Sequence, residues 1–272
     1  MKEYIEKARI LVEALPFIKM LYNKNFVIKY GGATMNDKEA NTTLMEDIVL
    51  LKYVGINPVI VHGGGPEISD MLNTMGIESK FINGLRVTDE NTMNIVEMML
   101  SGKINKRIVS ELQQRGLTSV GISGKDGNSL IAEKYIIPGC EYEEENDLGC
   151  VGTITHVNPE LILGLIENNV IPVIAPIATD KEGSTYNINA DYAAVAVAGA
   201  IKAKKLVFLT NVAGILKDKD DPNSLLHFVN SEEVNDLKTR GIISGGMIPK
   251  VDCCLSAIEK GVEMVHIING TI

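Results

Sequence analysis

The segment FVIKYGG at residues 26–32 decides the expected fold of this chain. A short apolar run stops there at two glycines and an amphipathic helical pattern follows, and the segment PVIVHGGG at residues 58–65 repeats this order. Glycine lacks a Cβ, so the backbone can turn sharply and direct several N–H groups at one anion, to which the following helix N-terminus adds partial positive charge. With Lys29 near the end of the first run, the two segments predict a site for a phosphoryl group.

Strand and helix patterns alternate along the rest of the chain. Strands are expected near 25–30, 57–61, 118–122, 129–137, 150–157, 170–175, 205–209 and 263–268, and helices near 37–54, 66–75, 89–100, 103–115, 159–168, 189–203 and 246–260. This alternation predicts an α/β fold, a three-layer α/β/α sandwich with a mostly parallel open sheet. Stretches near 76–88, 124–149 and 176–188 carry turn residues and are expected to form hairpins at the ligand edge of the sheet.

A separate helical pattern covers residues 1–22, and Pro16 is expected to kink or break it. Its apolar face is formed by Ile5, Ala8, Leu11, Val12, Leu15 and Ile18. The pattern alone leaves open whether this helix folds back on its own domain or packs on another surface. We expect an N-terminal helix at 1–22, an N-lobe at 23–180 and a C-lobe at 181–272, since 272 residues suit one large domain or two small lobes.

Composition excludes several classes of function. The formal net charge of −9 disfavours general affinity for nucleic acid or an anionic membrane. The longest apolar stretch, near 193–201, is far shorter than the ~20 residues of a membrane span. Glutamates at positions 3, 6 and 13 argue against a secretory signal.

The cysteines indicate a reducing environment. They are Cys140, Cys150, Cys253 and Cys254, with no C-x-x-C pair and few histidines nearby, so no zinc site is expected. Reduced thiols that pack as small hydrophobic groups fit a cytoplasmic protein.

The common nucleotide-binding motifs are absent. The segment GISGKD at 121–126 has Asp126 where a phosphate-binding loop requires a hydroxyl. No strand is followed by G-x-G-x-x-G, and protein-kinase catalytic motifs are missing. Any phosphoryl transfer must therefore use another scaffold.

Three other segments carry polar groups in informative places. Arg86 in NGLRVT (83–88) has the planar fork that pairs with carboxylates, although this segment alone favours a surface arginine. In NINAD the default interpretation is that Asn189 or Asp191 caps the following helix. Residues 187, 189 and 191 alternate, however, and three polar groups converging before a helix exceed what capping needs. Lys250 in GGMIPK (245–250) lies in the first turn of the last helix, where the dipole repels a cation. This position indicates an anion nearby, with a solvated lysine as the alternative.

Taken in order, six segments resemble the amino-acid kinase family from about Asn25 to Ile272. They are KYGG at 29–32, HGGG at 62–65, NGLRVT at 83–88, NINAD at 187–191, LTNVAG at 209–214 and GGMIPK at 245–250. NGLRVT resembles the branch that acts on N-acetylglutamate, rather than the branches that act on aspartate, glutamate, carbamate or uridylate. The resemblance implies ATP-dependent phosphorylation of the γ-carboxylate of N-acetyl-L-glutamate in arginine biosynthesis. It also implies Mg²⁺ held mainly by the nucleotide, with no metal held by the protein.

The resemblance also assigns roles to residues. Lys29 and Lys250 would stabilise the transferring phosphoryl group, Asp191 would orient both lysines, and Gly32 and Gly64 would donate N–H groups. The two binding sites would comprise Gly64, Gly65, Arg86 and Asn187 for N-acetylglutamate, and Gly31, Gly32, Thr210, Asn211, Gly214 and Lys250 for ATP. Asn211 stands where many relatives carry aspartate. A carboxylate nucleophile with a pKa near ~4.3 is already ionised, so no general base is required.

Regulation is implied in the same way. The family resemblance is to arginine-sensitive members, in which a kinked N-terminal helix links dimers into a hexamer, a trimer of dimers. Lys202, Glu263 and the backbone near Gly270 would hold inhibitory L-arginine, and a PII-type signal protein would be a further partner. Two alternatives stay open: another acyl-phosphate-forming kinase with aspartate or glutamate as acceptor, and a non-catalytic arginine sensor, which would be expected to lose Lys29, Lys250 or Asp191.

Overall fold

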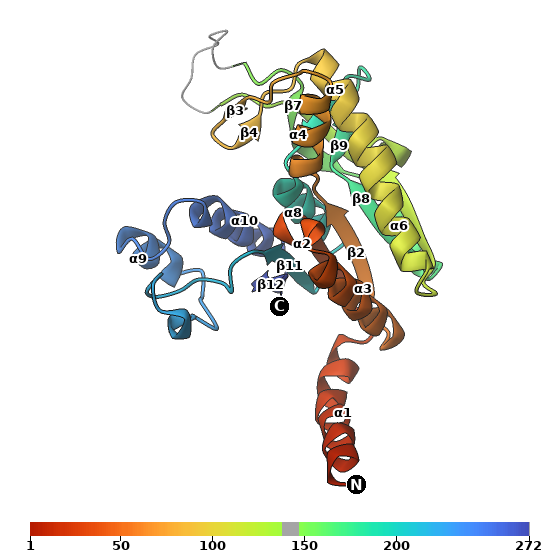
Figure 1. Ribbon diagram of the computed structural model, residues 1–272, viewed down its shortest axis with the longest axis vertical. Helices are drawn as coiled ribbons and strands as arrows, with labels where there is room; N and C mark the ends of the chain where they lie inside the picture. The colour runs from red at the N-terminus through yellow and green to blue at the C-terminus, as the bar shows by residue number, and fades with distance from the viewer. Residues whose placement is uncertain (138–146, 272) are drawn as a thin grey trace.

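The computed structural model describes residues 1–137 and 147–271, and its elements follow the order expected from the sequence (Figure 1). The helices are α1 (Lys2–Leu21), α2 (Ala33–Asn36), α3 (Lys38–Tyr53), α4 (Gly65–Thr74), α5 (Glu90–Glu97), the π-helix η1 (Met98–Ile104), α6 (Asn105–Gln113), η2 (Asp126–Asn128), α7 (Glu160–Glu167), α8 (Ala190–Ala200), η4 (Pro222–Ser224), α9 (Glu233–Thr239) and α10 (Met247–Glu259). The strands are β1 (Asn25–Tyr30), β2 (Asn57–His62), β3 (Phe81–Ile82), β4 (Leu85–Arg86), β5 (Ser119–Ser123), β6 (Leu130–Lys134), β7 (Val151–Val157), β8 (Ile171–Ala175), β9 (Ile177–Thr179), β10 (Thr185–Ile188), β11 (Lys205–Thr210) and β12 (Met264–Asn269).

A six-stranded sheet in the order β12-β11-β1-β2-β8-β5 forms the middle layer. Every neighbouring pair in it is parallel, so all six strands end at one edge. Both glycine turns, after β1 and β2, therefore lie at this carboxyl edge, which is where open α/β sheets bind ligands. The predicted parallel sheet is confirmed.

Helices cover both faces of the sheet. One core cluster joins the sheet to α7, α8 and α10, and the other joins it to α3, α4, α5 and α6. In Figure 1, α8 and α6 lie on opposite sides of β2 and β8. Ala193, Ala194 and Ala198 of α8 are fully buried, and such small side chains let this helix approach β1 and β11 closely. The three-layer α/β/α fold class is confirmed.

Four short strands, β10-β7-β6-β9, close into a small barrel at the carboxyl edge, since only Pro176 separates β8 from β9. The hairpins expected within 76–88 and 176–188 are confirmed as β3–β4 and β9–β10. Residues 138–146 of the third stretch, with Cys140, lie outside the described residues. The described cysteines Cys150, Cys253 and Cys254 are free thiols, as predicted.

The structure differs from the sequence expectations in three places. Helix α1 continues through Pro16 without a break, because an exposed helix can leave the carbonyl that loses its partner facing water. The other outcome expected at Pro16, a kink, stays a prediction. The helices expected at 89–100 and 103–115 are joined without a gap by η1. Helix α9 was missed, because its seven residues are too short to show a clear period.

Helix α1 also does not fold back on its own domain. It projects away from the sheet (Figure 1), and Ile5, Leu11, Val12 and Leu15 of its apolar face are each more than half exposed. Among the described residues, no helix is both long and apolar enough to cross a membrane.

Candidate active site

A cavity of about 290 Å³ lies between the two glycine turns at the carboxyl edge. We call it the turn cavity, and its lining includes Lys29, Gly32, Gly63, Gly64, Gly65, Arg86, Leu100, Asn187, Asn189 and Asp191. All of these residues except Leu100 come from four of the six sequence segments singled out above. The fold thus brings together groups that are up to about 160 positions apart in the chain.

Two lysines share one carboxylate at this cavity. The alternation of β1 turns Lys29 toward the α8 face, where its Nζ lies 2.8 Å from Asp191 Oδ1. Lys250, in the first turn of α10, places its Nζ 3.5 Å from Asp191 Oδ2. Asp191 is thereby held between two cations, in the geometry expected of a residue that orients both.

Asp191 stays ionised in this environment. Burial of the carboxylate raises its pKa. The positive charges of Lys29, which has the larger effect, and of Lys250 outweigh burial, so the pKa lies below the usual value. One negative charge faces two positive ones, and the pair of lysines keeps an excess of positive charge that suits a phosphoryl group.

The glycine turns require glycine for two separate reasons. Gly32 adopts the left-handed region, with φ of 63°, which other residues rarely enter. At Gly64 a Cβ would come within 2.4 Å of Ile104 Cδ1 and 2.9 Å of Leu100 Cδ2, because the π-helix η1 packs directly against the turn. Gly31 lies against Gly63, so the two turns approach each other closely.

Arg86 also lines the turn cavity and is buried, so the surface interpretation favoured by its segment alone was wrong. Its guanidinium donates to Ser79 Oγ at 2.6 Å, Ser69 Oγ at 2.8 Å and the Gly65 carbonyl at 2.9 Å, and it lies 4.7 Å from the Phe81 ring centre. Burial lowers its pKa, yet an arginine remains charged. In the described part of the chain no carboxylate forms an ion pair with it, so it is a cation held ready for an anion.

The polar residues before α8 face the same space. Asn187 donates to Thr88 Oγ1 at 3.2 Å, and Asn189 is the N-cap of α8, accepting from the Asp191 N–H at 2.8 Å. The default interpretation of Asn189 as a cap is therefore confirmed. All three residues of the alternating set line the turn cavity, and so do Ile188 and Ala190 between them.

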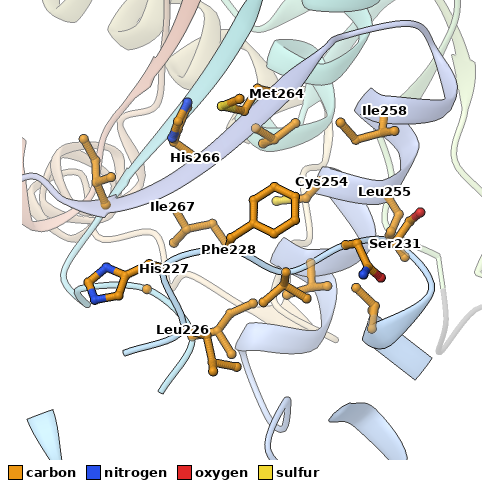
Figure 2. Close-up of a pocket in the computed structure, with 18 of the residues that line it drawn as sticks. Leu226, His227, Phe228, Ser231, Cys254, Leu255, Ile258, Met264, His266 and Ile267 are labelled. Carbon is orange, nitrogen blue, oxygen red and sulfur yellow. The ribbon is translucent and has the colours of Figure 1, made fainter. Parts of the chain in front are cut away.

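A second, larger cavity of about 510 Å³ lies beyond α10. Figure 2 shows largely apolar side chains from residues 226–228, α10 and β12 facing this space, which we call the apolar cavity. Gly214 lines it, together with Leu226, Val251 and Ile267. Val251 directly follows Lys250, so the start of α10 connects the apolar cavity to the lysine pair at Asp191.

The residues predicted to bind the nucleotide do not all line the same cavity. Thr210, at the end of β11, is buried and bonds to Val212 at both its carbonyl and its N–H, so it shapes the turn. Asn211 is exposed, and neither it nor Thr210 lines the apolar cavity, whereas Gly214 does.

The three residues assigned to arginine do not meet in one place. Lys202 follows α8 and Glu263 precedes β12, so both lie at the amino edge, where Glu263 pairs with Lys204. Gly270 follows β12 at the carboxyl edge. Six strand residues span ~20 Å, so Gly270 is separated from the other two by the length of the sheet. Their role in binding arginine stays a prediction.

The chemistry of the turn cavity does not suit a metal ion held by the protein. Asp191 is the carboxylate that lines it, and two lysines already neutralise this group. Among the described residues, no three His, Cys, Asp or Glu side chains gather as a metal-binding group. A divalent ion that accompanies a nucleotide would have to be held mainly by its phosphates.

Sequence reasoning missed two buried polar residues beneath the second glycine turn. His62 contacts Gly63 and Asn105, and Asn105 begins α6. The sequence signal was a histidine inside an otherwise apolar strand, directly before three glycines.

Comparison with known proteins agrees with this geometry. The model of the amino acid kinase family matches residues 24–269. An acetylglutamate kinase from Carboxydothermus hydrogenoformans is 52% identical over 274 residues, covering 100% of this chain and 93% of that protein. Another, from Caldanaerobacter subterraneus subsp. tengcongensis, is 54% identical over 268 residues, covering 98% of this chain and 87% of that protein.

Solved structures share the architecture. N-acetylglutamate synthase from Neisseria gonorrhoeae, complexed with coenzyme A and N-acetyl-glutamate, matches with a TM-score of 0.82 at 25% identity, covering 96% of this chain and 57% of that longer chain. Carbamate kinase from Giardia lamblia bound to AMP-PNP matches with a TM-score of 0.65 at 17% identity, covering 92% of this chain and 94% of that one, a likeness that shows the fold alone. The family match across the sheet and both glycine turns, with identities above one half over nearly the whole chain, shows that this chain belongs to the amino acid kinase family, in which it groups with the acetylglutamate kinases.

Proposed function

We propose that this protein is a kinase that phosphorylates the γ-carboxylate of N-acetyl-L-glutamate with ATP, in arginine biosynthesis. The observation that carries the proposal is the Lys29–Asp191–Lys250 arrangement between two glycine turns, with the buried Arg86 in the same cavity. The names of the relatives agree with it.

Each group has a defined part in this proposal. ATP with Mg²⁺ supplies the phosphoryl group. Lys29 and Lys250 neutralise the charge that develops on it, the Gly32 and Gly64 N–H groups bind its oxygens, and Asp191 holds both lysines in place. Arg86 binds the α-carboxylate of the acceptor, with Gly64, Gly65 and Asn187 around the remaining polar atoms. The acceptor carboxylate is ionised at neutral pH, so the site works by alignment and charge neutralisation.

The nucleotide is proposed to extend from the turn cavity into the apolar cavity. Gly31, Gly32 and Lys250 would contact its phosphates, and the turn from Thr210 to Gly214 would border its adenosine. The support is the position of α10, whose first turn carries Lys250 and whose next residues line the apolar cavity, a surface suited to a nucleobase.

Arginine inhibition and assembly are the finer part of the proposal. The protein would act in the cytoplasm as a hexamer linked through α1, with L-arginine as inhibitor and a PII-type protein as a further partner. The exposed apolar face of α1 supports a role in assembly, because an isolated helix gains little stability without a packed face. Arginine binding by Lys202, Glu263 and Gly270 rests on the resemblance.

A coupled assay of ADP release tests the proposed activity. Purified protein with Mg·ATP should release ADP rapidly with N-acetyl-L-glutamate and at least about 100-fold more slowly with L-aspartate or L-glutamate, which lack the acetyl group. A preference for aspartate or glutamate would establish the alternative acyl-phosphate kinase. No release with any acceptor would favour a non-catalytic sensor, although Lys29, Lys250 and Asp191 are all present.

A further inference from the structure

His62 is fully buried at the end of β2, directly before the second glycine turn. The alternation of the strand turns its side chain away from Val61 and toward the face covered by α6. Nδ1 lies 2.9 Å from the Gly63 carbonyl oxygen, and Nε2 lies 3.2 Å from Asn105 Nδ2. Packing alone does not require a buried histidine to form a hydrogen bond at each ring nitrogen.

The partners fix the protonation of this ring. A carbonyl oxygen only accepts, so Nδ1 must carry the proton and donate it to Gly63. Nε2 then accepts from the Asn105 amide, whose Nδ2 also faces the carbonyls of Val173 at 2.9 Å and Ile122 at 3.4 Å. Burial lowers the pKa of His62 to about 4, so the ring is neutral at physiological pH.

Asn105 is itself held rigidly. Its Oδ1 accepts from Lys106 Nζ at 3.1 Å, and it packs so closely on β5 that a Cβ at Gly121 would lie 1.7 Å from that oxygen. It begins α6 directly after the π-helix η1, and π-helical turns often mark functional sites. Asn105 therefore ties His62 to β5 and β8, the two strands beyond β2 in the sheet.

The hydrogen bond to Gly63 has a geometric consequence for Gly64. The described peptide bonds are trans, so the C=O of Gly63 and the N–H of Gly64 point in opposite directions across one plane. With the carbonyl held by His62, the N–H is turned away from the ring, and no atom of the described residues accepts a hydrogen bond from it. Gly64 lines the turn cavity.

We propose that His62, held by Asn105, is a positioning residue that fixes the Gly63–Gly64 peptide so that the Gly64 N–H faces the transferring phosphoryl group. This inference deepens the proposed function and rests on it. His62 does not touch substrate. Its effect is to keep one preorganised donor from rotating, and such a donor acts most strongly in the transition state.

Two substitutions of the same residue separate positioning from packing. His62→Asn keeps an N–H donor at the place of Nδ1, so Gly63 stays bonded, but loses the contact with Asn105. His62→Gln keeps a polar partner for Asn105 at the place of Nε2 but loses the donor to Gly63. Val61→Ala, one residue earlier on the opposite face, is the matched control for a cavity in the same strand.

The two His62 variants are expected to differ in kcat, while KM changes little in either. His62→Gln should lower kcat by about 10- to 100-fold, because one oxyanion-type donor is no longer fixed, while both KM values change by less than about threefold. His62→Asn should retain kcat within about fivefold, as should Val61→Ala despite its lower melting temperature. Equal losses in the Asn and Gln variants, or a loss that follows melting temperature across all three variants, would overturn the proposal. If His62→Gln does not fold, His62→Asn decides: a kcat loss above about tenfold contradicts the inference.

Binding of a transition-state mimic distinguishes this inference from the proposed function. Calorimetry with Mg·ADP and aluminium fluoride should show weaker binding to His62→Gln than to wild type, with Mg·ADP alone bound equally by both. A wild-type protein that phosphorylates no acceptor would refute the proposed function. Equal binding of the mimic by wild type and His62→Gln would refute the role of His62.

Discussion

At the scale of single residues, charge balance decides what the turn cavity can bind. Lys29 and Lys250 pair with the carboxylate of Asp191, and Arg86 adds a third cation to the site, so positive charge is in excess. The two lysines meet at Asp191, while Arg86 bonds to Ser69 and Ser79. Two anionic groups, a phosphoryl group beside the lysines and a carboxylate beside Arg86, match this distribution.

The lysine pair gives the first prediction. Lys29→Ala, Lys250→Ala and Asp191→Asn should each lower kcat by about 100-fold or more and change both KM values only a few-fold, because their interactions strengthen as charge develops in the transition state. Steady-state kinetics of ADP release measures this. Lys260→Ala, at the opposite end of α10, is the control and should behave as wild type. Near-normal turnover in either lysine variant would remove these residues from the reaction.

Arg86 gives the second prediction. Arg86→Lys should raise the KM for N-acetylglutamate by about 10- to 100-fold, since lysine keeps the charge but loses the fork that bonds Ser69, Ser79 and the ligand together. The KM for ATP should stay within about twofold, because the phosphoryl end of the cavity is unchanged. Calorimetric titration with each substrate checks both statements, with Arg115→Lys as the control. An unaltered affinity for the acceptor would mean that Arg86 only supports the β3–β4 hairpin.

At the scale of elements, two charged residues of the candidate site stand in the first turns of helices. Helix α8 begins at the carboxyl edge with Asn189 as its cap and Asp191 in its first turn, and α10 begins with Lys250 in its first turn. Both helices pack on the same face of the sheet, so their first turns converge. The position of Asp191 therefore depends on how firmly the start of α8 is held.

Removing the cap of α8 tests this dependence. Asn189→Ala should lower the stability by about 1 kcal/mol, or ~2–4 °C in melting temperature, because the Asp191 N–H loses its acceptor. It should also lower kcat, since Asp191 is no longer fixed between the lysines. Asp37→Ala removes the cap of α3 at a residue that does not line the turn cavity, and it should lower the melting temperature similarly with kcat near wild type. Calorimetric melts and kinetics of both variants are the measurements, and equal kcat in the two would show that capping does not position Asp191.

At the scale of the whole molecule, α1 stands apart from the three layers (Figure 1). Its apolar side chains, from Ile5 to Leu15, are exposed in the single chain. Exposed apolar surface of this extent on a helix indicates that another surface covers it. A second copy of α1 is the occupant implied by the proposed hexamer.

Deleting residues 1–22 tests that assembly. The sheet and both cavities lie outside this segment, so the truncated protein should keep its kcat while its mass in light scattering falls from that of a hexamer to that of a dimer. Inhibition by L-arginine should be lost with it. A truncated protein that stays hexameric and fully inhibitable would exclude this role for α1.

Local pattern alone was enough to predict the alternating strands and helices, the two glycine turns and the residue types of the site. Lys29, Asp191 and Lys250 could be chosen in advance because each stands at a strand end or a helix start, and in a parallel sheet those places share one edge. Capping by Asn189 followed from the same local chemistry. These features depend on residues close together in the chain, which is why they can be predicted from the sequence.

Features that depend on distant contacts were decided only by the tertiary structure. Arg86 looked like a surface residue until Ser69, Ser79 and Gly65 enclosed it, and His62 had no role until Asn105 was brought beneath it. Gly270 was grouped with Glu263 by the family resemblance, but a parallel strand separates them by its whole length. The apolar face of α1 gave no sign of whether it would pack on its own domain. In each case the pairing of segments far apart in the chain sets burial and distance, and local periodicity carries no information about that pairing.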